Sequence, residues 1–191
     1  ILDLSRILAG PTATQYLGDL GADVIKVERP DAGDDTRKWG PPYVTGADGK
    51  PPRESAYYLS SNRNKRSIAL DLKSDEDRRI FLELAKTADV IVENFRPDVK
   101  HRLGIDYDSL SADNPGLVYA SISGFGQDGP YADRPGFDQI AQGMGGLMSI
   151  TGLPGQGPVR AGIPIADLTA GLYAALGTLM ALLERGKTGH G

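Results

Sequence analysis

The chain has 191 residues, with 21 basic and 25 acidic side chains and a formal net charge of −4. The apolar share of 40% is enough to bury a core, and the acidic balance argues against a nucleic-acid-binding surface. The absence of cysteine excludes disulfides and thiol nucleophiles, and with His101 and His190 as the only histidines we expect no metal site.

The first part of the chain has the pattern strand, helix, strand. Ile1–Leu4 is a short apolar strand that leads into a Gly-Pro turn. Helical spacing follows over Thr12–Leu20, and the β-branched run in Ala22–Val27 predicts the next strand. The polar stretch from Glu28 to about Glu54, rich in proline and glycine, is expected to form a long loop.

The middle of the chain continues this alternation. Ser74 is a good N-cap, and the acidic residues after it suit the first turn of a helix. The expected elements are strands at Ser67–Leu72, Asp89–Glu93 and Leu117–Ser123, and helices from Ser74 to about Thr87 and over Tyr107–Asn114. Strands that alternate with helices predict an α/β fold, a Rossmann-like open parallel sheet with helices on both faces.

The last third of the chain has a different composition. Residues 139–159 carry no charge and are rich in glycine. A long helix is predicted from Asp167 to about Glu184, and because it is apolar nearly all round we expect it to be buried at a domain or subunit interface. Its charge-free run, Leu168–Leu183, is too short and too rich in glycine and alanine for a membrane span, so no membrane association is expected.

One glycine motif invites a dinucleotide-binding interpretation that we reject. Gly124–Gly129 matches G-x-G-x-x-G and follows a predicted strand. The motif works only where a helix starts and its amides meet a pyrophosphate. Pro130 and Pro135 exclude a helix of useful length at that point.

A second segment, Ala181–Thr188, resembles a relaxed phosphate-binding loop. Such a loop joins a strand to the helix that follows it, whereas this segment ends a helix. We therefore interpret Gly186 as a helix C-cap, with Arg185 and Lys187 complementing the negative helix terminus.

With no cysteine and two histidines, carboxylates are the candidate nucleophiles. Asp167 stands out because it begins the apolar helix and is the only acid between Asp138 and Glu184. An ordinary N-cap aspartate is the alternative interpretation. The two are compatible, since a helix N-terminus orients a carboxylate and favours its ionised form.

Basic residues cluster near predicted strands in two places, which would suit an anionic ligand with several phosphates. Ordinary surface charge is the alternative interpretation. The clusters are Arg37, Lys38, Arg63, Lys65, Arg66 and Lys73, and then Arg96, Lys100 and Arg102.

Several ordered blocks of the sequence together resemble the class III CoA-transferases, the family that includes formyl-CoA transferase and the α-methylacyl-CoA racemases. The resemblance runs over essentially all 191 residues and looks closest to the branch acting on short dicarboxylates such as succinate, glutarate or oxalate. The blocks are LDLSRILAGP, LGDLGADVIKVERP, GDDTRKWGPP, NRNKRSIALDL, VENFRP, RLGIDYDSL, SISGFGQDGPYADRPGFD and ADLTAGLYAAL.

The resemblance implies a domain organisation. Family members are about twice this length, and two chains interlock as rings. We therefore expect residues 1–191 to be the N-terminal part of a CoA-binding large domain, without the small domain and the C-terminal return segment, in a full-length interlocked homodimer. A cytoplasmic location, or the mitochondrial matrix in a eukaryote, is compatible with this.

The resemblance also implies roles for single residues. Asp167 matches the nucleophile that forms a mixed anhydride with the donor acyl group and then an aspartyl-CoA thioester. Acyl-CoA is a substrate and the acceptor is a carboxylic acid, and no tightly bound cofactor is expected. The residues implied to line the CoA site are Gln15, Arg37, Leu70, Lys73, Asn94, Phe95, Arg96, Arg102 and Phe137.

Two alternatives to CoA transfer stay open, and departures from the family pattern bear on them. The racemases have a proton-transferring histidine where this chain has Phe137, which cannot move a proton. Exchange at the α-carbon is therefore disfavoured, and racemisation is kept as the second hypothesis. Pro135 stands where formyl-CoA transferase has a lysine, which puts one CoA contact in doubt. A CoA-binding fragment without activity is the third hypothesis.

Overall fold

The computed structural model describes residues 1–46 and 54–191, so part of the predicted long loop lies outside the described residues. A five-stranded sheet organises the chain, and every pairing in it is parallel. In chain order the strands are β1 (Leu2–Asp3), β2 (Val24–Glu28), β3 (Lys65–Ala69), β4 (Val90–Glu93) and β5 (Val118–Ser121). Their spatial order is β3-β2-β1-β4-β5. The predicted Rossmann-like sheet is therefore confirmed.

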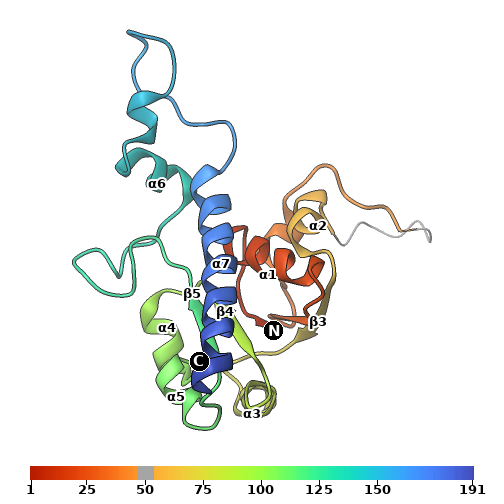
Figure 1. Cartoon of the computed structure of the whole chain (residues 1–191). Coiled ribbons are helices and arrows are strands. Elements are labelled where there is room, and N and C mark those ends of the chain that lie inside the picture. The colour runs from red at the N-terminus through yellow and green to blue at the C-terminus, as the bar shows by residue number, and fades with distance from the viewer. Residues whose placement is uncertain (47–53) are drawn as a thin grey trace.

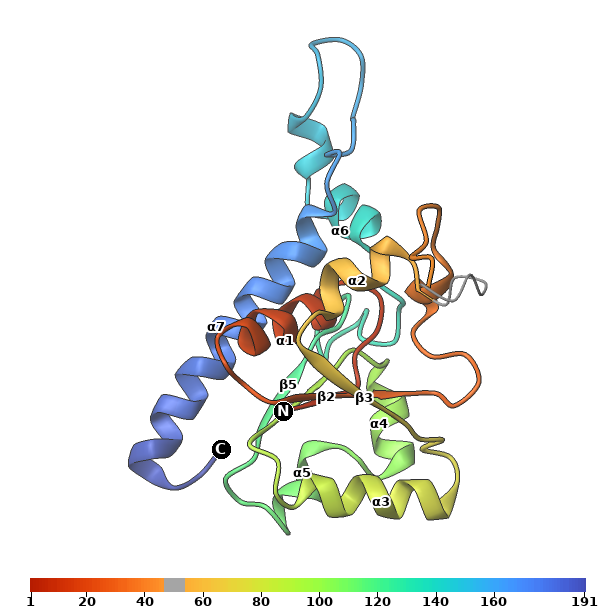
Figure 2. The same ribbon diagram turned by 90° about the vertical axis from the view of Figure 1, so that its right-hand side faces the viewer.

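Helices cover both faces of the sheet (Figure 2). On one side lie α1 (Ala9–Asp19), α2 (Ala56–Asn62) and α7 (Ile165–Thr188). On the other lie α3 (Asp75–Ala85), α4 (Pro97–Leu103) and α5 (Tyr107–Ser111). A short helix, α6 (Asp138–Met144), and two 3₁₀ turns, η1 (Asp35–Lys38) and η2 (Leu147–Ile150), complete the set. Figure 1 shows α6 and the chain after it projecting beyond the upper end of α7.

The main core lies between the sheet and the helices α3 and α5. Phe81 and Ala85 are one turn apart on α3 and pack with Ile91 of β4. Ile105 and Leu117 are fully buried in the same cluster. Full burial of a side chain the size of Phe81 stabilises the fold by about 2 to 3 kcal/mol. This cluster therefore stabilises the sheet whose strand ends carry the site.

Several local predictions need correction. The expected Gly-Pro turn before the first helix is wrong, because Gly10 and Pro11 lie inside the first turn of α1, where a proline loses no helical hydrogen bond. The helices α2, α4 and α6 were not predicted from the sequence. No helix starts at the Gly124–Gly129 motif, as expected, and the chain stays irregular until Asp138.

The long helix α7 ends later than predicted. Its cap is Gly189, which has the left-handed conformation, so Gly186 lies inside the helix and is not the C-cap. Arg185 does lie in the last turn, where it binds Asp89 and the carbonyl of Gly116. These contacts anchor the end of α7 beside β4 and β5.

Only one face of α7 is buried in the described part of the chain, and part of that face packs against α1. Gly171, Ala175 and Thr178 are buried, whereas the opposite face exposes apolar side chains such as Tyr173 and Met180. Within the described residues nothing covers this outer face, and its burial at a domain or subunit interface stays a prediction. By length and composition α7 could also cross a membrane, which corrects the expectation that its apolar run is too short. One such helix does not distinguish a span from a core helix.

Candidate active site

A cavity of about 790 Å³ lies at the carboxyl ends of the strands. Segments that follow β1, β3, β4 and β5 all contribute to its wall, together with the end of β2 and the start of α7. The strand order reverses between β1 and β4, whose continuations run in opposite directions across the sheet. Open parallel sheets bind their ligands at such a point, so the topology and the cavity agree.

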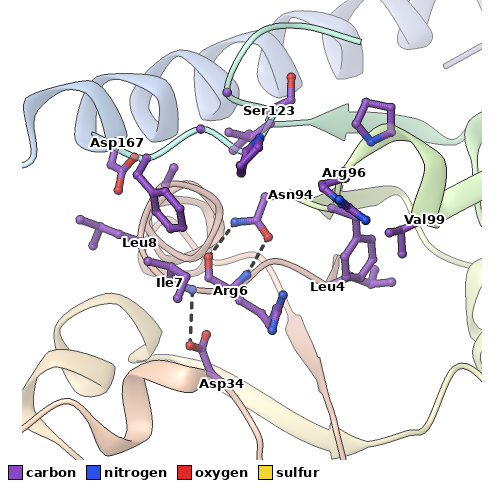
Figure 3. Close-up of a pocket in the computed structure, with 18 of the residues that line it drawn as sticks. Leu4, Arg6, Ile7, Leu8, Asp34, Asn94, Arg96, Val99, Ser123 and Asp167 are labelled. Carbon is purple, nitrogen blue, oxygen red and sulfur yellow. Dashed lines mark hydrogen bonds between the residues drawn. The ribbon is translucent and has the colours of Figure 1, made fainter. Parts of the chain in front are cut away.

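The crevice between β1 and β4 is held together by one side-chain amide (Figure 3). Asn94 accepts a hydrogen bond from the backbone N–H of Arg6 at 2.9 Å and donates one to the carbonyl of Arg6 at 2.7 Å. The next residue, Ile7, has a φ of 72°, which is unusual for a β-branched residue. Its N–H points to Asp34 at 3.4 Å. The backbone at the base of the cavity is thus held in an unfavourable conformation by its neighbours.

A buried ion pair lies below that segment. The ammonium of Lys26 is 3.0 Å from Asp34, and both side chains are shielded from solvent. Lys26 also donates to the carbonyl of Ser5 at 2.8 Å, and Asp34 accepts from Thr36. The two charges compensate each other within the protein, so the pair supports the wall of the cavity and is not free to bind a ligand.

Asp167 lies in the first turn of α7 and lines the cavity, not far from Leu8 (Figure 3). The N-cap position belongs to Pro164, so the alternative interpretation of Asp167 as an N-cap is wrong. Gly171, one turn further along α7, allows the approach of α1. A Cβ at that position would lie 2.5 Å from the carbonyl oxygen of Ala9. The close crossing of the two helices therefore brings Asp167 to the beginning of α1.

A second carboxylate, Asp138, orients the start of α7. One of its oxygens accepts the N–H of Ala166 at 2.9 Å and the N–H of Asp167 at 3.4 Å. Its other oxygen accepts from Gln142 at 2.7 Å, and Gln142 in turn accepts the N–H of Ala161 at 2.8 Å. This buried network fixes the backbone that carries Asp167.

Burial, with a smaller contribution from the charge of Asp138, raises the pKa of Asp167 to about 6. The position of Asp167 at a helix N-terminus predicts a carboxylate held in its ionised form, and the shift of the pKa has the opposite direction. No cation lies within salt-bridge distance of Asp167 in the described part of the chain. At neutral pH most of it is still ionised, and it is a more basic carboxylate than an ordinary aspartate.

Seven of the ten residues implied by the resemblance line this one cavity. They come from four different segments that the sheet brings together. They are Leu70, Lys73, Asn94, Phe95, Arg96, Phe137 and Asp167. Asn94 lines the cavity as implied, but its own side-chain amide is engaged by the backbone of Arg6.

The other three implied residues do not line it. Gln15 is buried and bridges the carbonyl of Ser60 and the N–H of Arg63. Arg102 is exposed on α4, 3.7 Å from Asp98. Arg37 is bound by both oxygens of Glu28, by Glu54 and by Tyr58, and these hydrogen bonds, above all those to Glu28, raise its pKa. A role for these three in binding CoA stays a prediction.

Some residues of the cavity wall were missed. Arg6, Ile7 and Leu8 line it, and the SRILAG segment carried no chemical signal apart from the resemblance. Arg134 also lines it, and its guanidinium lies over the ring of Tyr131 at 4.0 Å. Among the described residues Arg134 has no carboxylate within salt-bridge distance, so its charge is available to an anion.

The described ranges, 1–46 and 54–191, hold no group of three or more histidine, aspartate or glutamate side chains suited to a metal ion. Neither His101 nor His190 lines the cavity. The titratable groups that face it are therefore carboxylates, lysines and arginines.

Comparisons with known proteins agree with this geometry. The family model described as CoA-transferase family III matches residues 1–191. A succinate–glutarate CoA-transferase of Agrobacterium fabrum is 51% identical over 191 residues, which are 100% of this chain and 48% of that protein. A human succinyl-CoA:glutarate CoA-transferase is 50% identical over 191 residues, 100% of this chain and 42% of that protein. The chain thus spans about half the length of these relatives.

The fold has a close counterpart among solved structures. The crystal structure of a CAIB/BAIF family protein from Brucella suis has a TM-score of 0.94 to this chain and 49% sequence identity. The match covers 100% of this chain and 49% of that one.

Proposed function

This chain belongs to CoA-transferase family III, and from that premise we propose that the complete protein transfers CoA between carboxylic acids, with Asp167 as the nucleophile. The relatives named for succinate and glutarate support short dicarboxylic acids as the substrate class. The observation that carries the proposal is the place of Asp167. It is a half-buried carboxylate without a cation partner among the described residues, at the wall of a cavity that also presents Lys73 and Arg96.

The first half of the proposed reaction loads CoA onto the protein. The carboxylate of Asp167 attacks the thioester carbonyl of the donor acyl-CoA, the C–S bond breaks, and a mixed anhydride and CoA thiolate form. The thiolate then attacks the aspartyl carbonyl and expels the donor acid as its carboxylate. The product is an aspartyl-CoA thioester, and no proton has been gained or lost.

The second half reverses these steps with another acid. The acceptor carboxylate attacks the aspartyl thioester, which releases CoA thiolate and forms a new mixed anhydride. The thiolate attacks the acceptor carbonyl, acyl-CoA leaves, and Asp167 regains its carboxylate. Since the nucleophile acts in its ionised form, the sequence needs no general base, which fits a cavity without histidine.

The arrangement suits the parts of the substrate that do not react. Lys73 and Arg96 follow β3 and β4, and Arg134 comes from the loop after β5. Together they offer positive charge for the phosphates of CoA. Figure 3 shows Asp167 and Leu8 at one side of the cavity and Arg96 at the other, so an elongated ligand would place its charged and reacting ends apart.

The racemase hypothesis is less well supported. Phe137 lines the cavity at the position where a proton-transferring residue would be required, and a phenyl ring has no exchangeable proton. Racemisation needs two groups that move a proton at the α-carbon. Exchange of the α-hydrogen of an acyl-CoA for deuterium, without CoA transfer, would favour that activity over ours.

The decisive experiment is intact mass spectrometry of the complete protein. We would incubate it with succinyl-CoA, quench in acid, and compare it with Asp167→Ala and with Asp113→Ala, an exposed aspartate outside the cavity. We expect an adduct of acyl or CoA mass in the parent protein and in Asp113→Ala, and none in Asp167→Ala. An equal adduct in Asp167→Ala would refute the nucleophile, and no adduct with any acyl-CoA would refute the covalent route.

A further inference from the structure

The ammonium of Lys100 joins three segments beside the cavity. It lies 3.2 Å from Glu93 at the end of β4, 2.8 Å from the hydroxyl of Ser121 at the end of β5, and 2.6 Å from the side-chain carbonyl of Gln127. Lys100 itself is buried on α4. An ammonium group has three protons, and all three have an acceptor here.

The first of these contacts reaches one wall of the cavity. The second oxygen of Glu93 accepts the backbone N–H of Phe95 at 2.7 Å. Glu93 is fully buried, so its charge depends on Lys100 and on this N–H. The ion pair therefore holds the turn that carries Asn94, Phe95 and Arg96 into the cavity.

The contact with Gln127 reaches another wall. Gln127 lies on the loop between Gly124 and Gly136, whose ends touch so closely that a Cβ on Gly124 would overlap the Cα of Gly136. Part of this loop, including Arg134, lines the cavity, and Phe137 follows directly after it. Among the hydrogen bonds of the described residues, the one from Lys100 is the only one that ties this loop to the rest of the chain.

We propose that Lys100 is a positioning residue for the ligand: it sets the distance between the Asn94–Arg96 turn and the loop that carries Arg134, so that both walls meet CoA together. The proposal rests on the proposed function, because it assumes that CoA occupies this cavity. A buried ion pair is a costly way to stabilise a fold, and an apolar side chain would serve packing alone as well. Three directed hydrogen bonds fix a geometry, which an apolar contact does not.

Gln127 offers the sharper test, because it is exposed and its replacement leaves the core intact. We would measure the Kd of CoA for the complete protein by calorimetry, together with Tm. We expect Gln127→Ala to weaken CoA binding about tenfold without lowering Tm. Gln127→Glu keeps an acceptor for the ammonium and should bind CoA like the parent protein. Gln156→Ala, an exposed glutamine without a side-chain hydrogen bond among the described residues, is the matched control.

Lys100→Met completes the design. If Lys100 acts through Gln127, then adding Gln127→Ala to Lys100→Met should weaken CoA binding no further, whereas independent effects would multiply. Unchanged CoA binding in Gln127→Ala, or loss of binding in Lys100→Met only in proportion to a lower Tm, would refute the positioning role while the adduct on Asp167 stands. Absence of CoA binding by the parent protein would refute the proposed function and this inference with it.

Discussion

Two aspartates of this chain, one at the end of β1 and one at the start of α7, have opposite surroundings. Asp3 on β1 is fully buried, and burial alone would raise its pKa, but the ammonium groups of Lys26 and Lys65 hold it well below its usual range. Lys65 is 3.0 Å away, and the hydroxyl of Thr14 donates at 2.7 Å. Within residues 1–46 and 54–191 no such cation lies beside Asp167, and burial and Asp138 raise its pKa to about 6.

The difference separates a structural carboxylate from the one that we propose to be reactive. Asp3 is neutralised by charges and hydrogen bonds within the protein, so it has no capacity left for a ligand. Asp167 faces a cavity and has no compensating cation among the described residues, which suits the role of nucleophile that we propose for it. The surroundings lower the pKa of Asp3 and raise that of Asp167, which fits a structural role for the first and the proposed catalytic role for the second.

The largest expected effect concerns the structural member of this pair. Asp3→Asn leaves Lys65 and Lys26 buried with less compensating charge, and we expect a loss of about 3 to 5 kcal/mol in the free energy of unfolding at pH 7. Because the folded pKa of Asp3 is depressed, its contribution is present above about pH 4 and is lost as the pH falls below that value. Urea denaturation of the complete protein at several pH values measures both.

Asp113→Asn, at an exposed position, is the control and should change stability by less than about 0.5 kcal/mol. If Asp3→Asn lowered the free energy of unfolding as little as this control does, the buried ammonium groups of Lys26 and Lys65 would not need the charge of Asp3. The contrast between the two aspartates would then be lost.

Asp167, the proposed nucleophile, should respond in the opposite direction. Its folded pKa of about 6 lies above the ordinary value of 3.8, so the fold disfavours the charged carboxylate at any pH above 6. Asp167→Asn removes that charge, and we expect the variant to be more stable than the parent protein by about 1 to 3 kcal/mol at pH 8. The gain should vanish near pH 4, where the parent carboxylate is protonated. A stability loss at pH 8 would show that Asp167 is a structural group after all.

The smallest effect concerns the neighbour that helps to raise the pKa. We expect the rate of adduct formation on Asp167 to fall as the pH drops through about 6, because the protonated acid is not a nucleophile. In Asp138→Asn one negative charge is gone while a side-chain oxygen still accepts the N–H of Ala166. The midpoint should therefore move below 6, though not to 3.8, since burial remains. Rapid-quench mass spectrometry over a pH series gives the midpoint, and an unmoved midpoint would leave burial as the only cause.

Much of the fold followed from the sequence because its signals are local. The β-branched runs and the helices between them are enough to predict a parallel sheet. The elements that were predicted occur in the predicted order along the chain. The missed helices, α2, α4 and α6, have seven residues each, too few for a clear apolar period. For α4 there was a usable signal, since Pro97 occupies its start and Gly104 its left-handed C-cap.

The site was less accessible, since it depends on partners that are far apart in the chain. The sequence does not show which carboxylates bind Arg37. In the structure Glu28 and Glu54 bind its guanidinium, and Arg37 does not line the cavity. Likewise the position of Asp167 suggested a favoured, ionised acid at a helix N-terminus. Its raised pKa comes from burial and from Asp138, 29 residues away. Only the folded chain shows which charges are compensated.

The glycine contact at the neck of the loop after β5 has a further consequence, for variation. Since Gly124 and Gly136 meet, everything between them enters and leaves the sheet at nearly the same point. Residues in that interval can be exchanged, shortened or extended while β5 and α6 keep their places. The loop is thus joined to the sheet at nearly one point, so its contact with Lys100, and not its two ends, decides how it lies against the cavity.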